Sequence, residues 1–324
     1  MTPYLMVRDQ LESLLFDQST NEAIREGLPE WGITFFELIT HLGDGAALII
    51  FATLLYWFGA ESRRQRRALV IAIGIGALAI SAGMKGIFVR PRPELAGDYG
   101  GYSFPSAHAL GAAAFYGALA VVADTGTRAQ RYFAAGTIIL LVAFSRVVIG
   151  VHYVGDVVVG VIVGLLFVAV LLRDQTPEPG FVFILAGAIA LLALGLGSRE
   201  FTTMTIGASL GATVAWNTVA NRDSDPRGAS ILLLAYLCLP IIVVVRTATS
   251  VLGTPDLGSL QWALEIIGYA AATGLILAVP VIAENLNDWP PVEWLQGRLP
   301  FTGRTIDPEK LPQRQADDCL LYSI

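Results

Sequence analysis

The chain has 324 residues, of which 54% are apolar and only 15% are charged, with a mean hydropathy of +0.61. Soluble domains average about 25% charged residues, so this composition excludes an ordinary soluble protein and a disordered one. The formal net charge of −6 argues against a nucleic-acid partner. The composition therefore predicts an all-α, polytopic membrane protein built as a helical bundle.

Residues 1–43 are predicted to form amphipathic helices that lie on the membrane surface. A pattern typical of interfacial helices supports this, in which apolar residues fall at helical spacing among charged ones: Leu5, Leu11, Leu14, Leu15 and Phe16. In the alternative interpretation, Trp31–Leu42 extends the first membrane span.

Nine apolar segments follow, which we interpret as nine transmembrane helices. They are Ala46–Gly59, Ala68–Val89, His108–Ala123, Tyr132–Gly150, Val154–Leu172, Phe181–Gly197, Thr205–Val219, Ala229–Val245 and Trp262–Ala283. The expected units are a five-span core at 44–175, a four-span bundle at 176–284, and an interfacial segment with a polar tail at 285–324. The four-span bundle contains runs of small residues, such as Gly207–Gly211, that allow helices to pack closely. This bundle could serve helix packing and formation of a homo-oligomer, or it could form the wall of a groove for a lipid tail.

Basic loop residues predict the orientation in the plasma membrane. Arg63, Arg64, Arg66 and Arg67 follow the first span and are expected on the cytoplasmic side. Alternation of the spans then places residues 90–107 and 151–153 on the extracytoplasmic side.

The outer end of the second span carries Lys85, Arg92 and Pro93. Lys85 lies about two helical turns before Arg92, so both cationic groups can converge at the interface, where the prolines end the helix. Both cations could equally be anchors whose charged ends reach the membrane surface.

The third span begins with Pro105-Ser106-Ala107-His108. Ser106 is well placed as a helix N-cap, and the backbone N–H groups of the first turn would form an anion site that His108 faces. Ser106 could also be an N-cap with no further role.

The junction of the fourth and fifth spans carries Arg146 at the end of the fourth span, His152 in the loop and Asp156 at the start of the fifth. His152 and Asp156 are four residues apart and are expected on one face of a helix, where the carboxylate would bind one imidazole nitrogen and leave the other as a nucleophile. Arg146 supplies a bidentate fork for phosphate, or else pairs with Asp156 to close the hairpin.

Together the three segments place three cations, a serine, two histidines and a carboxylate at the outer ends of four spans. This inventory fits phosphoryl transfer, in which cations hold the phosphate oxygens, one histidine attacks phosphorus and the other protonates the leaving oxygen. It does not resemble a metal site, and no P-loop motif is present. An anion transporter is the alternative of another class, although its site is expected near the membrane midplane.

The same segments resemble the tripartite signature of the type-2 phosphatidic acid phosphatase superfamily, K-x6-R-P, P-S-G-H and S-R-x5-H-x3-D. Lys85 to Pro93 satisfies the first part, and Ser145 to Asp156 satisfies the third. The second part matches with Ala107 in place of the usual glycine, a change that reduces backbone freedom but keeps the backbone donor.

The resemblance implies a role for each matched residue. His152 would be the nucleophile that forms a phosphohistidine, Asp156 its orienting partner and His108 the general acid. Lys85, Arg92, Ser106, Ala107 and Arg146 would bind the phosphate, and no metal or cofactor would be needed.

The implied activity is hydrolysis of a membrane lipid phosphate at the outer face, with a polyprenyl phosphate or diphosphate or a phosphatidate-type lipid as substrate. A phosphotransferase that uses a lipid or sugar hydroxyl as acceptor would need the same residues. Vanadate, a phosphate mimic, is expected to inhibit.

Overall fold

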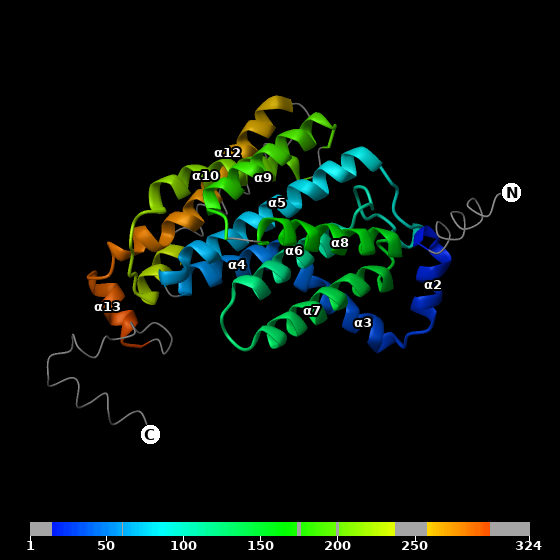
Figure 1. The fold of residues 1–324 in the computed structure, drawn as a ribbon, viewed down its shortest axis with the longest axis horizontal. Helices are drawn as coiled ribbons and strands as arrows, with labels where there is room; N and C mark the ends of the chain where they lie inside the picture. The colour runs from blue at the N-terminus through cyan, green and yellow to red at the C-terminus, as the bar shows by residue number, and fades with distance from the viewer. Residues whose placement is uncertain (1–14, 60, 174–175, 199–200, 237–257, 299–324) are drawn as a thin grey trace, which may run out of the picture.

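The computed structural model describes residues 15–59, 61–173, 176–198, 201–236 and 258–298, and all of its regular structure is helical (Figure 1). The α-helices are α2 (Gln18–Glu26), α3 (Glu30–Ile39), α4 (Gly45–Phe58), α5 (Arg64–Phe88), α6 (Ala107–Val122), α7 (Arg128–Val148), α8 (Val154–Leu171), α9 (Pro179–Gly195), α10 (Thr202–Val219), α12 (Gly258–Glu284) and α13 (Pro290–Gln296). Short 3-10 helices lie at Thr40–Gly43, Glu61–Arg63 and Glu94–Ala96.

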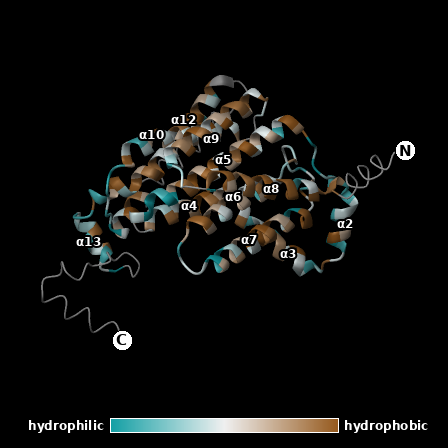
Figure 2. Ribbon diagram, viewed as in Figure 1, coloured by the Kyte–Doolittle hydropathy of each residue, from teal (hydrophilic) through white to brown (hydrophobic). Residues whose placement is uncertain are grey.

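Helix α5 occupies the middle of the bundle. It packs against α4, α6 and α8 on one side and against α9 and α10 on the other, an arrangement visible in Figure 1. Its most apolar stretch is 78% buried, the largest share among the candidate spans. Apolar residues cover most of the helices, and polar ones gather at helix ends and loops (Figure 2).

The predicted apolar segments coincide with helices wherever the structure describes them. Eight of the nine correspond to α4 through α10 and α12. In the remaining segment, Ala229–Val245, the structure describes residues 229–236 as helix, and 237–245 lie outside the described residues.

Fewer of these helices are long and apolar enough to cross a membrane individually. Among the described residues, α5, α7, α8 and α12 meet that criterion. A fifth span forms if Glu30–Gly43 and Gly45–Phe58, which are bent by 53° relative to each other, count as one. Helices α6 and α9 are apolar but have fewer than 18 residues. The chain is therefore a polytopic helical membrane protein with four or five clear spans.

Helices α6 and α8 approach closely at two glycines. A Cβ on Gly160 would lie 2.9 Å from the Ser106 carbonyl oxygen, and one on Gly164 would lie 2.6 Å from that of Leu110. Glycines four residues apart allow two helix backbones to approach at membrane depth. This contact brings the N-termini of α6 and α8 together, and the Ser106 N–H donates to the Asp156 carbonyl at 3.0 Å.

The helices after α8 are tied to the rest of the bundle at several points. Arg64, at the start of α5, is buried and donates to the Val219 carbonyl and the Ser224 hydroxyl, both at 2.9 Å. Tyr56 and Trp57 of α4 donate to carbonyls of α12 at 3.0 and 2.8 Å. Helices α9, α10 and α12 therefore pack onto the first bundle.

Candidate active site

Residues predicted from the sequence to bind phosphate or act in catalysis lie at four helix ends. Lys85 is in the last turn of α5, Ser106 caps α6, Arg146 is in the last turn of α7, and Asp156 is in the first turn of α8. The intervening loops supply Arg92 and His152. The basic residues at the start of α5 lie at the opposite end of that helix, where Arg63 and Arg66 pair with Asp124.

His152 is buried, and its two ring nitrogens have different environments. Nδ1 lies 3.3 Å from Oδ2 of Asp156, which also accepts the Tyr153 N–H at 2.9 Å. Nε2 lies 3.1 Å from Nη1 of Arg92. The expected pairing is present, but His152 lies in the loop before α8, so the prediction of a shared helical face was wrong. Asp156 reaches back from the first turn of α8 instead.

Arg92 is held by backbone carbonyls around the loop. Its Nε donates to Gly100 and its Nη1 donates to Val151, both at 3.0 Å. These bonds fix the guanidinium beside Nε2 of His152, the nitrogen that Asp156 leaves available.

Lys85 and Arg146 are each about 1% exposed. The Lys85 ammonium donates to the Tyr102 carbonyl at 2.8 Å, and Nη1 of Arg146 donates to the Thr40 hydroxyl at 2.6 Å. Arg146 thus bonds to Thr40, as opposed to closing the hairpin through Asp156.

Burial and positive charge act together on His152. Burial, followed by the charges of Arg92, Arg146 and Lys85, holds the pKa of His152 well below its usual value of 6.5. The ring is therefore neutral at physiological pH, the form in which an imidazole nitrogen is nucleophilic.

Ser106 and His108 occupy the start of α6. The Ser106 side chain accepts the Ala109 N–H at 3.5 Å, so it acts as the N-cap that the sequence predicts. The N–H groups of Ala107 and His108 belong to the first turn, where helix geometry leaves donors without intrahelical acceptors. The Ser106 N–H donates to the Asp156 carbonyl at 3.0 Å, which places the first turn of α6, with His108, next to the first turn of α8 and the loop that carries His152.

Asp44 is a member of this site that the sequence analysis missed. Its Oδ1 lies 2.7 Å from Nε2 of His108, and its Oδ2 lies 2.7 Å from Nδ1 of His41. Nothing in the spacing of Asp44, 64 positions before His108, signals this contact. Its place immediately before an apolar helix was the one available clue.

Two further residues that the sequence analysis missed lie against the site. Asn21 of α2 is fully buried, and its Nδ2 donates to the carbonyls of Val147 at 3.0 Å and His152 at 2.8 Å. The ring of Tyr99 lies 5.5 Å from the Arg92 guanidinium and 6.0 Å from that of Arg146. Both contacts join parts of the chain whose proximity depends on the tertiary fold.

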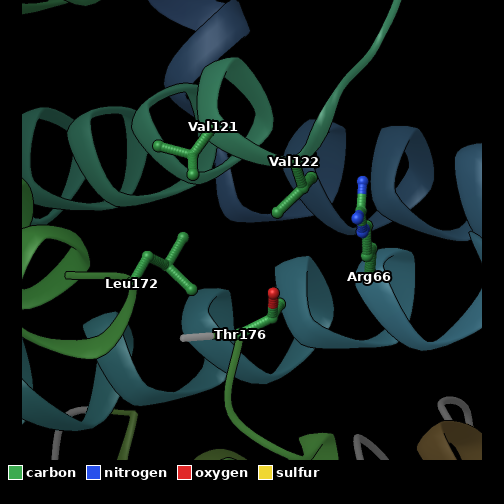
Figure 3. Close-up of a pocket in the computed structure, with 5 residues that line it drawn as sticks. All are labelled: Arg66, Val121, Val122, Leu172 and Thr176. Atoms are coloured by element: carbon green, nitrogen blue, oxygen red, sulfur yellow. The ribbon is translucent and has the colours of Figure 1, made fainter. Parts of the chain in front are cut away.

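A pocket of about 160 Å³ lies elsewhere, at the other end of α5 and α6 (Figure 3). It is lined by Arg66, Val121, Val122, Leu172 and Thr176. None of the residues predicted to bind phosphate or act in catalysis lines it. In the part of the chain that the structure describes, no three His, Cys, Asp or Glu side chains are grouped as a metal site would require.

Comparison with known proteins gives consistent matches. The model of the PAP2 superfamily matches residues 65–178, a range that includes every site residue predicted from the sequence. Phosphatidylglycerophosphatase B of Bacillus subtilis is 31% identical over 46% of this chain and 80% of its own length. Lipid A 1-phosphatase of Rhizobium etli is 31% identical over 48% of this chain and 75% of its own length.

A solved structure is also similar to part of the chain. It is the transmembrane PAP2-type phosphatidylglycerolphosphate phosphatase from Bacillus subtilis, with 26% identity and a TM-score of 0.45 over 52% of this chain and 85% of that one. The family assignment depends on the sequence matches, in which this chain covers most of both relatives. The chain belongs to the PAP2 superfamily, and it is a phosphoric ester hydrolase of the PAP2 phosphatase family.

Proposed function

We propose that this membrane phosphatase hydrolyses a lipid phosphate monoester or diphosphate through a phosphohistidine on His152, without a metal or cofactor. The observation that carries the proposal is the environment of His152, whose Nδ1 faces Asp156 while Nε2 faces Arg92. A neutral histidine with one nitrogen held by a carboxylate and the other directed at a guanidinium is arranged to attack a bound phosphate.

In the first half-reaction, Nε2 of His152 attacks phosphorus and the bond from phosphorus to the lipid oxygen breaks. His108 donates a proton to that oxygen, so the lipid leaves as an alcohol, or as a shorter phosphate from a diphosphate. Asp156 stabilises the positive charge that develops on the His152 ring.

In the second half-reaction, water attacks the phosphohistidine. His108, now neutral, takes a proton from that water, and the bond from nitrogen to phosphorus breaks to release inorganic phosphate. Both histidines return to their starting protonation states.

Lys85, Arg92 and Arg146 are proposed to hold the phosphate oxygens, with Ser106 and the backbone N–H groups of Ala107 and His108. Two of these cations, Lys85 and Arg146, are almost completely buried. At low dielectric a fixed cation stabilises developing charge on a phosphoryl group more strongly than it would in water.

A lipid substrate is supported by the relatives, whose names specify a phosphatidylglycerophosphate and lipid A. It is also supported by the position of the site at the ends of apolar helices, where a headgroup and its tail can both be accommodated. We propose the broader class of phosphatidate-type lipids and polyprenyl phosphates or diphosphates.

We also propose that the site opens to the extracytoplasmic side of the plasma membrane in a nine-span arrangement, with bundles at 44–175 and 176–284. The test is cysteine labelling after Cys238 and Cys319 have been replaced by serine. Asp98→Cys, in the exposed loop beside the site, should react with a membrane-impermeant maleimide on intact cells. Thr125→Cys, at the other end of α6, should react only after permeabilisation, and the reverse pattern would refute the orientation.

The activity is tested by phosphate release from detergent-purified protein with EDTA present. The substrates are phosphatidic acid, phosphatidylglycerol phosphate, a long-chain polyprenyl diphosphate and an aryl phosphate. Turnover should fall about 1,000-fold or more in His152→Ala, because the nucleophile is absent. Wild type quenched in alkaline denaturant, in which the N–P bond of a phosphohistidine is stable, should carry phosphate on His152, and Asp156→Asn should form this intermediate more slowly.

The outcomes separate the alternatives. Metal-free turnover that is lost in His152→Ala and inhibited by vanadate supports the proposal. Transfer of phosphate to a lipid or sugar hydroxyl without net release would identify a phosphotransferase. Substrate uptake that persists in His152→Ala would indicate transport.

A further inference from the structure

The turn between α9 and α10 brings an aromatic ring to the buried lysine of the site. The centroid of the Phe201 ring lies 5.6 Å from Nζ of Lys85, within the range of a cation–π interaction. Lys85 is about 1% exposed. Phe201 lies beyond residues 65–178, the range that the family model matches.

This turn is packed against α5 directly beside Lys85. A Cβ on Gly86 would lie 3.0 Å from the Ser198 backbone nitrogen and 3.1 Å from the Leu196 carbonyl oxygen. One turn earlier, a Cβ on Gly83 would lie 3.5 Å from Cβ of Ala193. Two small residues on α5 therefore allow the end of α9 and the following turn to approach the lysine.

Hydrogen bonds within the turn fix the position of Phe201. The Thr202 hydroxyl donates to the Ser198 carbonyl at 3.0 Å, and the Thr205 hydroxyl donates to the Phe201 carbonyl at 2.9 Å. Ser198 and Thr202 are both buried. Helix α10 is also anchored at its far end, where Arg64 of α5 binds the Val219 carbonyl.

Backbone strain is concentrated around the same lysine. Within the described part of the chain, only two residues other than glycine have positive φ, Val89 at 47° and Phe201 at 60°. The Val89 N–H donates to the Lys85 carbonyl at 3.1 Å, and Phe201 covers the Lys85 side chain. Left-handed conformations are unfavourable for bulky residues and persist where the surrounding structure requires them.

We propose that Phe201 is a positioning residue for Lys85, and that Phe201, together with residues 196–198 at the end of α9, thereby forms one wall of the phosphate site. The π-face attracts the ammonium and excludes water from that side. Together with the Tyr102 carbonyl, it holds the ammonium in one place for an incoming phosphate. The role of Lys85 as a phosphate ligand belongs to the proposed function, and the present inference rests on it.

The inference is tested with variants that distinguish the effect of the aromatic face from the effects of side-chain volume and of the positive φ. Phe201→Leu keeps an apolar side chain but removes the π-face, whereas Phe201→Tyr and Phe201→Trp keep an aromatic face. Phe201→Asn suits a positive φ but lacks the ring. Leu196→Ala, in the same turn, is the matched control.

We expect Phe201→Leu and Phe201→Asn to raise KM for phosphatidic acid and the inhibition constant of orthovanadate about tenfold, with a much smaller change in kcat. Phe201→Tyr, Phe201→Trp and Leu196→Ala should stay within about twofold of wild type. A folded Phe201→Leu protein that matches wild type would overturn the inference. Equal losses in the leucine and tyrosine variants would also overturn it, because that pattern indicates packing alone.

A measurement without turnover distinguishes this inference from the proposed function. Inorganic phosphate should raise the Tm of the wild-type protein and should do so less at the same concentration in Phe201→Leu. If wild type hydrolyses no substrate but this difference persists, the proposed function fails and the positioning role stands. If phosphate raises neither Tm, the role of Lys85 as a phosphate ligand and the inference both fail.

Discussion

Nε2 of His108 and Oδ1 of Asp44 lie 2.7 Å apart, although 64 positions separate the two residues. Asp44 stands at the bend between the 3-10 helix Thr40–Gly43 and α4, and Gly43 makes its approach possible. A Cβ on Gly43 would lie 2.5 Å from the Val142 side chain and 3.4 Å from Cβ of His108. The bend in the first span therefore delivers a carboxylate to the proposed general acid.

Replacing Asp44 should impair protonation of the leaving group. We expect Asp44→Ala to lower kcat/KM, which reports the first half-reaction, about 10- to 100-fold with lipid phosphates, because His108 loses the partner that orients its ring. The loss should be much smaller with an aryl phosphate, whose phenolate leaves with little need for a proton. Equal losses on both substrates would contradict the assignment of His108 as the acid.

His41 provides a graded control for this prediction. It binds the other oxygen of Asp44 at 2.7 Å but is exposed. His41→Gln should therefore lower kcat/KM by less than Asp44→Ala, and steady-state kinetics on the same two substrates checks the order.

Asn21 is expected to keep the loop of the nucleophile in place. Both of its amide hydrogens are directed at carbonyls, those of Val147 and His152. Asn21→Ala should leave these buried acceptors without their donor. The free energy of unfolding should therefore fall by about 1–3 kcal/mol. Asn21→Asp should be worse, because it places a carboxylate oxygen against two carbonyl oxygens.

Formation of the phosphoenzyme provides the functional measurement. Its rate should fall in both Asn21 variants and stay at the wild-type value in Glu26→Ala, an exposed position on the same helix. A wild-type rate in Asn21→Ala would show that the loop needs no support from α2.

The pH profile should report the neutral state of His152. Its pKa is lowered mainly by burial and then by Arg92, Arg146, Lys85 and His108. The alkaline limb of the kcat/KM profile should report His108, which must be protonated to act as the general acid. Because the neutral His152 ring is the nucleophile and prevails above its lowered pKa, the acid limb should lie below pH 6.5. Arg92→Gln removes one positive charge and should move this acid limb to higher pH. An acid limb centred above pH 6.5 in wild type would exclude His152 as the nucleophile.

The sequence predicted the parts of the site that depend on local helix geometry. Ser106 caps α6 because serine before an apolar helix favours that position. Asp156 meets His152 because the first turn of α8 lies beside the loop that precedes it, and the loop conformation, not a shared helical face, brings the two side chains together. Asp44, Asn21 and Phe201 could not be found this way. Their contacts depend on the bend before α4, on the docking of α2 and on the turn after α9, which are tertiary features.

Helices α6 and α8 pack so closely at Gly164 that there is no room for a side-chain atom at this position. A Cβ there would lie 2.6 Å from the Leu110 carbonyl oxygen and 2.8 Å from Cβ of Ala113. Gly164→Ala should force the helices apart and lower the free energy of unfolding by about 1–3 kcal/mol. Thermal unfolding in detergent measures this loss. The substitution should also reduce activity, because Ser106 and Asp156 lie at the adjoining ends of these helices.

Gly136→Ala is the matched control, since a Cβ at that helical position meets nothing within 4 Å. The control should be stabilised by up to about 1 kcal/mol, because alanine is the better helix former. If Gly164→Ala were as stable as Gly136→Ala, close contact between α6 and α8 would not be what aligns the two halves of the site.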